Sequence, residues 1–307
     1  LNPFSFTSIF LTCFYVIFFV GILNTINFMD GIDGLVCSCM SIIFLTFAIR
    51  YDIDFCLSTN ISSVISYRPY ADVQDHRTIS KEFFVFNYRH MFNTDYIASV
   101  LTHEAIHPIL NHYGIDNGVY FSAFYEYDVE DAVKMMLFNE ATSYSWQLRH
   151  AWQERENSPL LWQQLERDRS VQSLMAAAMN NAYEDNPNIT EAELQIIAFN
   201  AFFADTDLLN TYANGFINQY IRAMQAGVAD PKREIDNTSF MWLDNVFPEQ
   251  ESMFSSDLRV SFDSETVLEN LDPNLKQSIT NIQVYMDREN NPVIVSVPKR
   301  TSGTSPS

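Results

Sequence analysis

The sequence predicts a mainly α-helical protein with a small β element, preceded by one or two hydrophobic membrane helices. In the second part of the chain, apolar side chains recur at three- and four-residue steps, as in helices that bury one face. Residues 81–88 contain four consecutive apolar side chains, which predicts a strand that is buried on both faces or lies at a covered sheet edge. The first 29 residues carry no charge.

Two uncharged runs near the start predict contact with a membrane. Residues 4–23 are nearly all apolar, and a run of about 20 such residues can span a bilayer. The run at residues 34–49 is short for a hydrocarbon core of roughly 30 Å, so we expect it to be re-entrant or truncated. The first run lacks the basic leader and cleavage site of a signal peptide, and the initial Leu indicates a fragment.

A dense polar motif separates the two runs: Asn24-Thr-Ile-Asn27-Phe-Met-Asp30-Gly-Ile-Asp33-Gly-Leu. Acids in a loop at the membrane can hold Mg²⁺ against a nucleotide diphosphate, and the glycines allow close approach. The motif resembles the signature of the polyprenyl-phosphate N-acetylhexosamine-1-phosphate transferases, a polytopic membrane family. The resemblance covers about residues 4–50 and implies Asp33 as the Mg²⁺ ligand, with Asn24, Asn27 and Asp30 nearby. The paired upstream aspartates and the histidine-bearing loop of that family are missing from this sequence, so we expect a vestigial fragment that serves as an anchor or arose by fusion.

The second part contains the pentad His103-Glu-Ala-Ile-His107 inside a segment predicted to be helical over residues 95–113. Two histidines four residues apart on a helix point the same way, so both rings can reach one metal ion. Glu104 could then act on a metal-bound water. Pro108 removes a backbone donor, which predicts a kink or an early helix end just after His107.

A zinc site needs a third protein ligand, and the sequence offers two candidates. His112 lies five residues beyond His107, whereas Glu140 lies within the apolar stripe of a helix predicted over residues 129–154. A buried acid is costly without a partner, and a metal ion is one such partner. We therefore favour Glu140 and keep His112 as the alternative. Neither His90 nor His150 has supporting spacing, and His76 lies in a polar loop, where we expect a solvated histidine.

Residues 67–154 resemble a bacterial zincin-type metallopeptidase domain, in the strand at 81–88, the His103 pentad and the dipeptide Glu140-Ala. In such families the third ligand is a glutamate followed by alanine on the next long helix, although the residues after Ala141 depart from the usual run. The resemblance implies a zincin-like α+β fold and Zn²⁺ as the cofactor.

By this resemblance, Zn²⁺ would be held by His103, His107 and Glu140. Glu104 would act as the general base toward a peptide or protein substrate paired with the strand at 81–88. The leading hypothesis is zinc-dependent peptide hydrolysis. The alternatives are the transferase remnant and a non-catalytic interaction domain that keeps zinc for folding.

Composition divides the chain into two unlike parts. The formal net charge is −20, which argues against a nucleic-acid partner because phosphates would be repelled. All four cysteines precede residue 67, so disulfides do not hold the second part together. We expect a membrane segment at 1–55, a linker at 56–80, a metallopeptidase-like domain at 81–285 and a C-terminal tail at 286–307. The domain beyond the membrane segment should be soluble, and cytoplasmic if that segment arose by fusion.

Further helices are predicted downstream of the motif. One should cover residues 160–183, and a second should cover 191–203 behind a capping box formed by Thr190 and Glu193. A third should run from 206 to about 226, ending at a glycine, and a short terminal helix should lie within 262–280.

Overall fold

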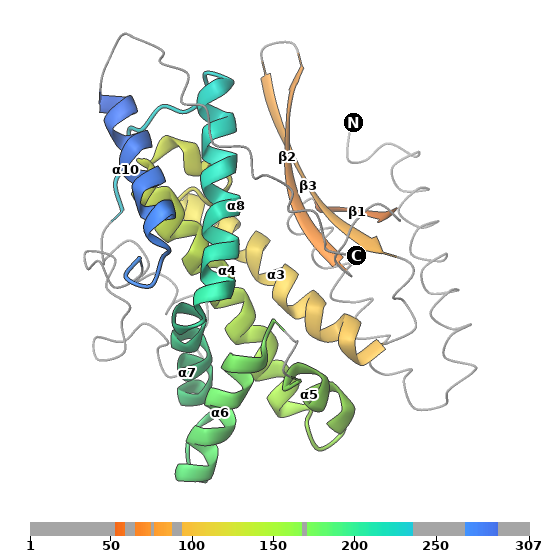
Figure 1. Ribbon diagram of the computed structural model, residues 1–307. Helices are drawn as coiled ribbons and strands as arrows, with labels where there is room; N and C mark the ends of the chain where they lie inside the picture. Colours follow the sequence, from red (N-terminus) through yellow and green to blue (C-terminus); the bar gives the residue numbers. More distant parts are fainter. Residues whose placement is uncertain are drawn as a thin grey trace, which may run out of the picture.

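The computed structural model describes residues 53–58, 65–74, 77–87, 94–167, 171–235 and 268–287. Within these ranges the protein is mainly helical, with a small three-stranded sheet beside a group of helices (Figure 1). The expectation of a mainly α fold with a small β element is thereby confirmed. The predicted membrane segments lie outside the described residues, and no helix in the described ranges is long and apolar enough to cross a bilayer.

The sheet consists of strands β1 (Ile53–Ser58), β2 (Ile65–Gln74) and β3 (Arg77–Asn87). Strand β3 is central, because it pairs in parallel with β1 and antiparallel with β2. The strand predicted at 81–88 is therefore present but begins earlier. Residues 56–80 were expected to be a linker, yet most of them belong to strands. Only two residues separate β2 from β3, so the two strands pair along nearly their full lengths as a hairpin.

Helix α3 (Thr94–Asp116) lies between the sheet and the remaining helices and contacts both β2 and α4 (Figure 1). The early helix end that was one expectation at Pro108 does not occur, since the helix continues for two further turns. Proline removes one hydrogen bond, to the carbonyl of Glu104, while Ile106 and Leu110 on either side of it are buried in the core. The turn after the helix uses Gly118 at φ +81°, a backbone conformation that glycine adopts without strain.

Helix α4 (Val129–Gln153) is the central element, in contact with α3, α7 and α8. Its start follows the prediction, because the side chain of Asp128 accepts a hydrogen bond from the backbone N–H of Asp131 at 3.0 Å. A short 3₁₀ helix, η2 (Phe121–Glu126), connects α3 to α4. Most of α4 is buried, so a polar side chain on its inner faces needs a partner within the protein.

The remaining helices surround α4. They are α5 (Pro159–Leu165), α6 (Ser173–Asp185), α7 (Glu191–Ala204), α8 (Thr206–Gln225) and α10 (Pro273–Asp287). The single helix predicted over 160–183 is two helices, α5 and α6. Both the start of α7 and its capping box agree with the prediction. The terminal helix α10 begins within the expected range but continues seven residues beyond residue 280, and it packs on α8 and α4.

Candidate metal centre

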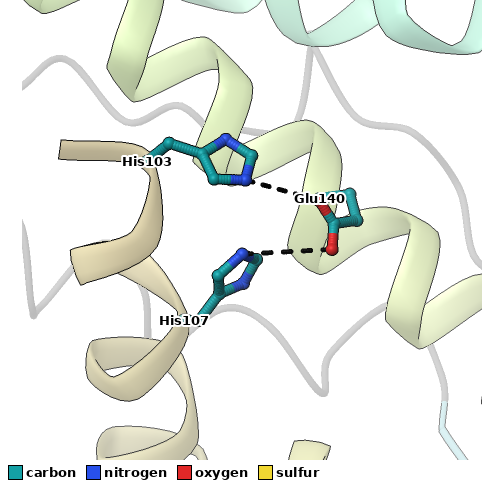
Figure 2. A group of neighbouring side chains, drawn as sticks. All are labelled: His103, His107 and Glu140. Atoms are coloured by element: carbon teal, nitrogen blue, oxygen red, sulfur yellow. Dashed lines mark ion pairs between the residues drawn. The ribbon is translucent and has the colours of Figure 1, made fainter. Parts of the chain in front are cut away.

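Helices α3 and α4 bring His103, His107 and Glu140 together, and Figure 2 shows both rings turned toward the carboxylate. The Nε2 atom of His103 lies 3.5 Å from Oε2 of Glu140, and Nε2 of His107 lies 3.9 Å from Oε1. One donor atom from each residue falls within 4.8 Å of the others. Ligands bound at about 2.0–2.2 Å to a tetrahedral zinc would be about 3.4 Å apart. The three donors are therefore nearly spaced for one ion.

Burial sets the protonation of these side chains. His103 and His107 are only 7% and 8% exposed. Burial lowers the pKa of His103 to about 3. Burial also lowers the pKa of His107, with a smaller opposing effect from the nearby charge of Glu140. Both imidazoles are consequently neutral at pH 7, which is the form that offers a lone pair to a metal ion. For Glu140, burial raises the pKa, the usual cost of a carboxylate held in a low-dielectric site.

A hydrogen bond to Asn139 orients the ring of His107. The Nδ1 atom of His107 lies 2.8 Å from Oδ1 of Asn139, and both side chains are buried. A carbonyl oxygen only accepts, so Nδ1 carries the proton and Nε2 keeps its lone pair toward Glu140. The hydroxyl of Ser143 lies 3.3 Å from the same nitrogen and donates to the backbone carbonyl of Asn139.

The ring of His103 is held differently. Among the described residues its Nδ1 is buried without a hydrogen-bond partner. The ring packs edge-on against Tyr144, with centroids 4.4 Å apart, and against His107 at 5.0 Å. Ring packing therefore fixes the orientation of His103, while a hydrogen bond fixes that of His107.

Two tyrosines adjoin the carboxylate. The hydroxyls of Tyr144 on α4 and Tyr212 on α8 lie 2.7 Å apart, so these two buried side chains are hydrogen-bonded to each other. Burial raises the pKa of both tyrosines, with a further contribution from the charge of Glu140. They are therefore protonated and can donate hydrogen bonds at neutral pH. Sequence reasoning missed both tyrosines as well as Asn139.

The other candidate residues are not among the three clustered donors. Glu104 is partly buried on α3, and its charge contributes to the raised pKa of both tyrosines, but it is not one of the three clustered donors. His112 is exposed on α3, and His150 lies in the last turn of α4. Four residues of the transferase motif and two other histidines lie outside the described residues: Asn24, Asn27, Asp30, Asp33, His76 and His90.

The pairing of strand β3 argues against the expected role of the strand at 81–88 in binding substrate. An extended peptide joins a sheet by pairing with a free strand edge. Strand β3 is paired on one side with β1 from Glu82 to Asn87, and on the other side with β2 from Arg77 to Phe86. From Glu82 to Phe86 the strand is thus paired on both sides, and this part cannot accept a peptide strand without losing a neighbour.

Comparison with known proteins gives a family match for the N-terminal part of the chain. A family model described as glycosyl transferase family 4 matches residues 2–99. No curated protein and no solved structure matches the chain. The match supports the interpretation of the N-terminus as a transferase-family fragment, and it supports association with a membrane. It extends well beyond the residues 4–50 expected from the motif, and it ends one turn before His103.

The same finding corrects the leading hypothesis. The family match points to a sugar-phosphate transferase, so the prediction of a zinc metallopeptidase of the zincin type is contradicted. The physical reason is that the His103 pentad and Glu140 specify a set of metal donors and do not by themselves specify a hydrolytic reaction. In addition, β3 is paired on both sides from Glu82 to Phe86 and offers no free edge to a peptide there.

Proposed function

We propose that the chain joins a remnant of a membrane sugar-phosphate transferase to a helical domain that binds Zn²⁺ for stability. The family match over residues 2–99 supports the first part. The observation that carries the second part is the convergence of His103, His107 and Glu140, with one donor from each residue within 4.8 Å of the others.

The chemistry of the donors favours zinc. Two neutral imidazoles and one carboxylate suit Zn²⁺, whereas Mg²⁺ prefers a shell of oxygen ligands. A buried carboxylate facing two neutral rings lacks a compensating positive charge, and a divalent cation between the three groups would supply it. The cluster therefore fits the ion.

The structural consequence is that zinc would join α3 to α4. A ligand that binds only the folded state stabilises that state, by about 2.7 kcal/mol when its free concentration is a hundred times the dissociation constant. Because His103 and His107 come from α3 and Glu140 from α4, the free energy of unfolding should rise with zinc concentration. Bound zinc would thus hold the helical domain in a fixed shape, as expected of a non-catalytic interaction domain.

The test of the zinc site uses the full chain, purified in detergent and freed of metal by a chelator. After reloading and desalting, mass spectrometry for metals should find about one zinc per chain. Changing both His103 and His107 to Ala should abolish binding, and Glu140→Gln should weaken it. His112→Ala is the matched control, because this exposed histidine lies on the same helix. Unchanged zinc content in the double variant would refute the proposed site.

The transferase part is tested separately. We expect residues 24–35 to be vestigial, because the family match covers under a third of the chain. The full chain should enter the membrane fraction and should show no transfer of sugar phosphate to a polyprenyl phosphate. Transfer that is detected in the parent chain and lost in Asp33→Asn would instead establish an active transferase.

A further inference from the structure

We propose that Asn117, in the turn after α3, is a site of spontaneous deamidation, at which water converts the asparagine to aspartate and isoaspartate. The chain contains two Asn-Gly dipeptides, Asn117-Gly118 and Asn214-Gly215, and all four residues are exposed. Their backbones differ, because the first pair follows the end of α3 and the second lies inside α8. The proposal concerns the end of α3 and does not depend on the metal centre.

The reaction needs only the chain and water. The backbone nitrogen of Gly118 attacks Cγ of the Asn117 amide and forms a new C–N bond. The proton of this nitrogen passes through solvent to the amide nitrogen, which leaves as ammonia, so a cyclic succinimide remains. Water then opens the ring. Breaking the new C–N bond gives aspartate, and breaking the original peptide bond gives isoaspartate. Glycine favours the attack because it has no Cβ to crowd the ring.

The backbone nitrogen of Gly118 is lightly held. Its N–H donates to the carbonyl of Ile115 at 3.2 Å, just past the last residue of α3, and this bond must open before the attack. Gly118 has φ +81°, and apart from its chain neighbours no described heavy atom lies within 4 Å of the place where a Cβ would be. Exposed turns and helix ends open at a small fraction of the free energy of global unfolding. The reaction can therefore proceed while the rest of the protein stays folded.

The side chain of Asn117 holds the end of α3 until it reacts. Its Nδ2 donates to the carbonyl of Tyr113 at 2.7 Å in an exposed bond, which competes with water and opens readily. The product carboxylate can only accept, so it cannot restore this bond. It also places a negative charge beside the carbonyls at the C-terminus of a helix, where the helix dipole disfavours it. Deamidation should therefore loosen the last turn of α3.

Helix α8 protects the second dipeptide. Gly215 lies in the middle of this helix, so freeing its N–H for attack disrupts backbone hydrogen bonds on both sides. Asn214 is also held by Asn218, whose Nδ2 donates to the backbone carbonyl of Asn214 at 2.7 Å and to its Oδ1 at 3.3 Å. The chain thus contains its own control, which has the same dipeptide and similar exposure but a constrained backbone.

The test incubates the full chain, purified in detergent, in a mildly alkaline buffer. Mass spectrometry of peptides then follows the change from amide to acid at each dipeptide. Asn117 should react more than about tenfold faster than Asn214 in the folded chain, and the two rates should become similar in urea. An isoaspartyl methyltransferase should label the product at position 117. Asn117→Gln is the matched control variant, because its longer amide would have to close a larger ring, and it should abolish the change at this position.

Hydrogen exchange measures the effect on the fold. The N–H of Val119 donates to the carbonyl of Gly114 at 2.8 Å across the same turn, so it should exchange faster in the deamidated chain, while exchange in α8 stays unchanged. Unchanged exchange at Val119 would overturn the loosening of α3. The modification site itself is overturned if Asn117 stays intact in the folded chain under conditions that deamidate it in urea. Equal rates at Asn117 and Asn214 in the folded chain would overturn the role of the turn.

Discussion

Replacement of Asn139 by Ala provides the most direct test of how the candidate metal centre is organised. The amide oxygen of Asn139 accepts from Nδ1 of His107 at 2.8 Å in a buried site. Without this acceptor, the ring can rotate or change tautomer, and Nε2 is no longer held with its lone pair toward Glu140. We expect zinc affinity to fall about 10–100-fold, or about 1.4–2.7 kcal/mol. Ser143, 3.3 Å from the same nitrogen, could take over part of the bond, which places the expected loss in the lower half of this range.

Asn139→Ala should also lower the free energy of unfolding of the metal-free protein. A buried N–H group that loses its partner typically lowers the free energy of unfolding by about 1–3 kcal/mol. Chemical denaturation of the metal-free protein would measure this loss, while chelator competition would measure zinc affinity. Nitrogen chemical shifts of the imidazole would report the tautomer of His107.

Gln195→Ala separates the two effects. Gln195 is also buried, and its amide oxygen accepts from Nη1 of Arg149 at 3.0 Å, so truncation should destabilise the fold by a comparable amount. Its side chain is hydrogen-bonded to Arg149 and Ser145 and to none of the three metal donors, so zinc affinity should not change. The reasoning is refuted if Asn139→Ala binds zinc as tightly as the parent, or if Gln195→Ala weakens binding to the same degree.

Three further predictions concern stability, measured by urea denaturation. Burial, with a smaller effect from Asp128, raises the pKa of Asp131 to about 6, so the folded state binds this proton more tightly than the unfolded state. The free energy of unfolding should therefore fall by about 1 kcal/mol, allowing for partial exposure, as pH rises from about 4 to 6, and Asp131→Asn should remove this fall. Thr190→Ala should cost about 1 kcal/mol, because Oγ1 of Thr190 accepts from the backbone N–H of Glu193 at the start of α7. Phe202→Ala should cost about 3–5 kcal/mol, because the ring is fully buried; a loss under 1 kcal/mol would contradict the packing.

Local chemistry explains which helices could be predicted from the sequence. The starts of α4 and α7 depend on Asp128 and Thr190, whose side chains bond backbone groups only three residues away. The separation of α5 from α6 and the pairing of β1 with β3 depend on contacts between distant segments. The continuation of α3 through Pro108 likewise depends on packing against α4, which local rules for proline do not include.

In the candidate site, too, some residues could be predicted from local sequence patterns and others depend on the tertiary fold. Helical spacing placed His103 and His107 on one face, and the apolar stripe of α4 indicated that Glu140 faces inward. These three residues could therefore be predicted from the sequence to form one group. Asn139 is adjacent to Glu140, but an asparagine in a helix has no pattern that marks it as a partner of a distant ring. Tyr212 comes from a helix whose position on α4 is set by the tertiary fold alone. The reaction was the least predictable feature, since the same donors suit a structural ion and a catalytic one.

The end of the family match bears on how the two parts of the chain are joined. The matched residues extend to Ser99, which lies inside α3 and is buried. Its hydroxyl oxygen accepts a hydrogen bond from Nε2 of Gln147 on α4 at 3.0 Å. The matched segment therefore ends within a continuous helix that is already packed on the helical domain, one turn before the first metal donor. Strand β2, within the matched residues, also contacts α3. The boundary of the match is thus a boundary in sequence only, because β2 and the first turns of α3 belong to the same packed structure as the candidate metal centre.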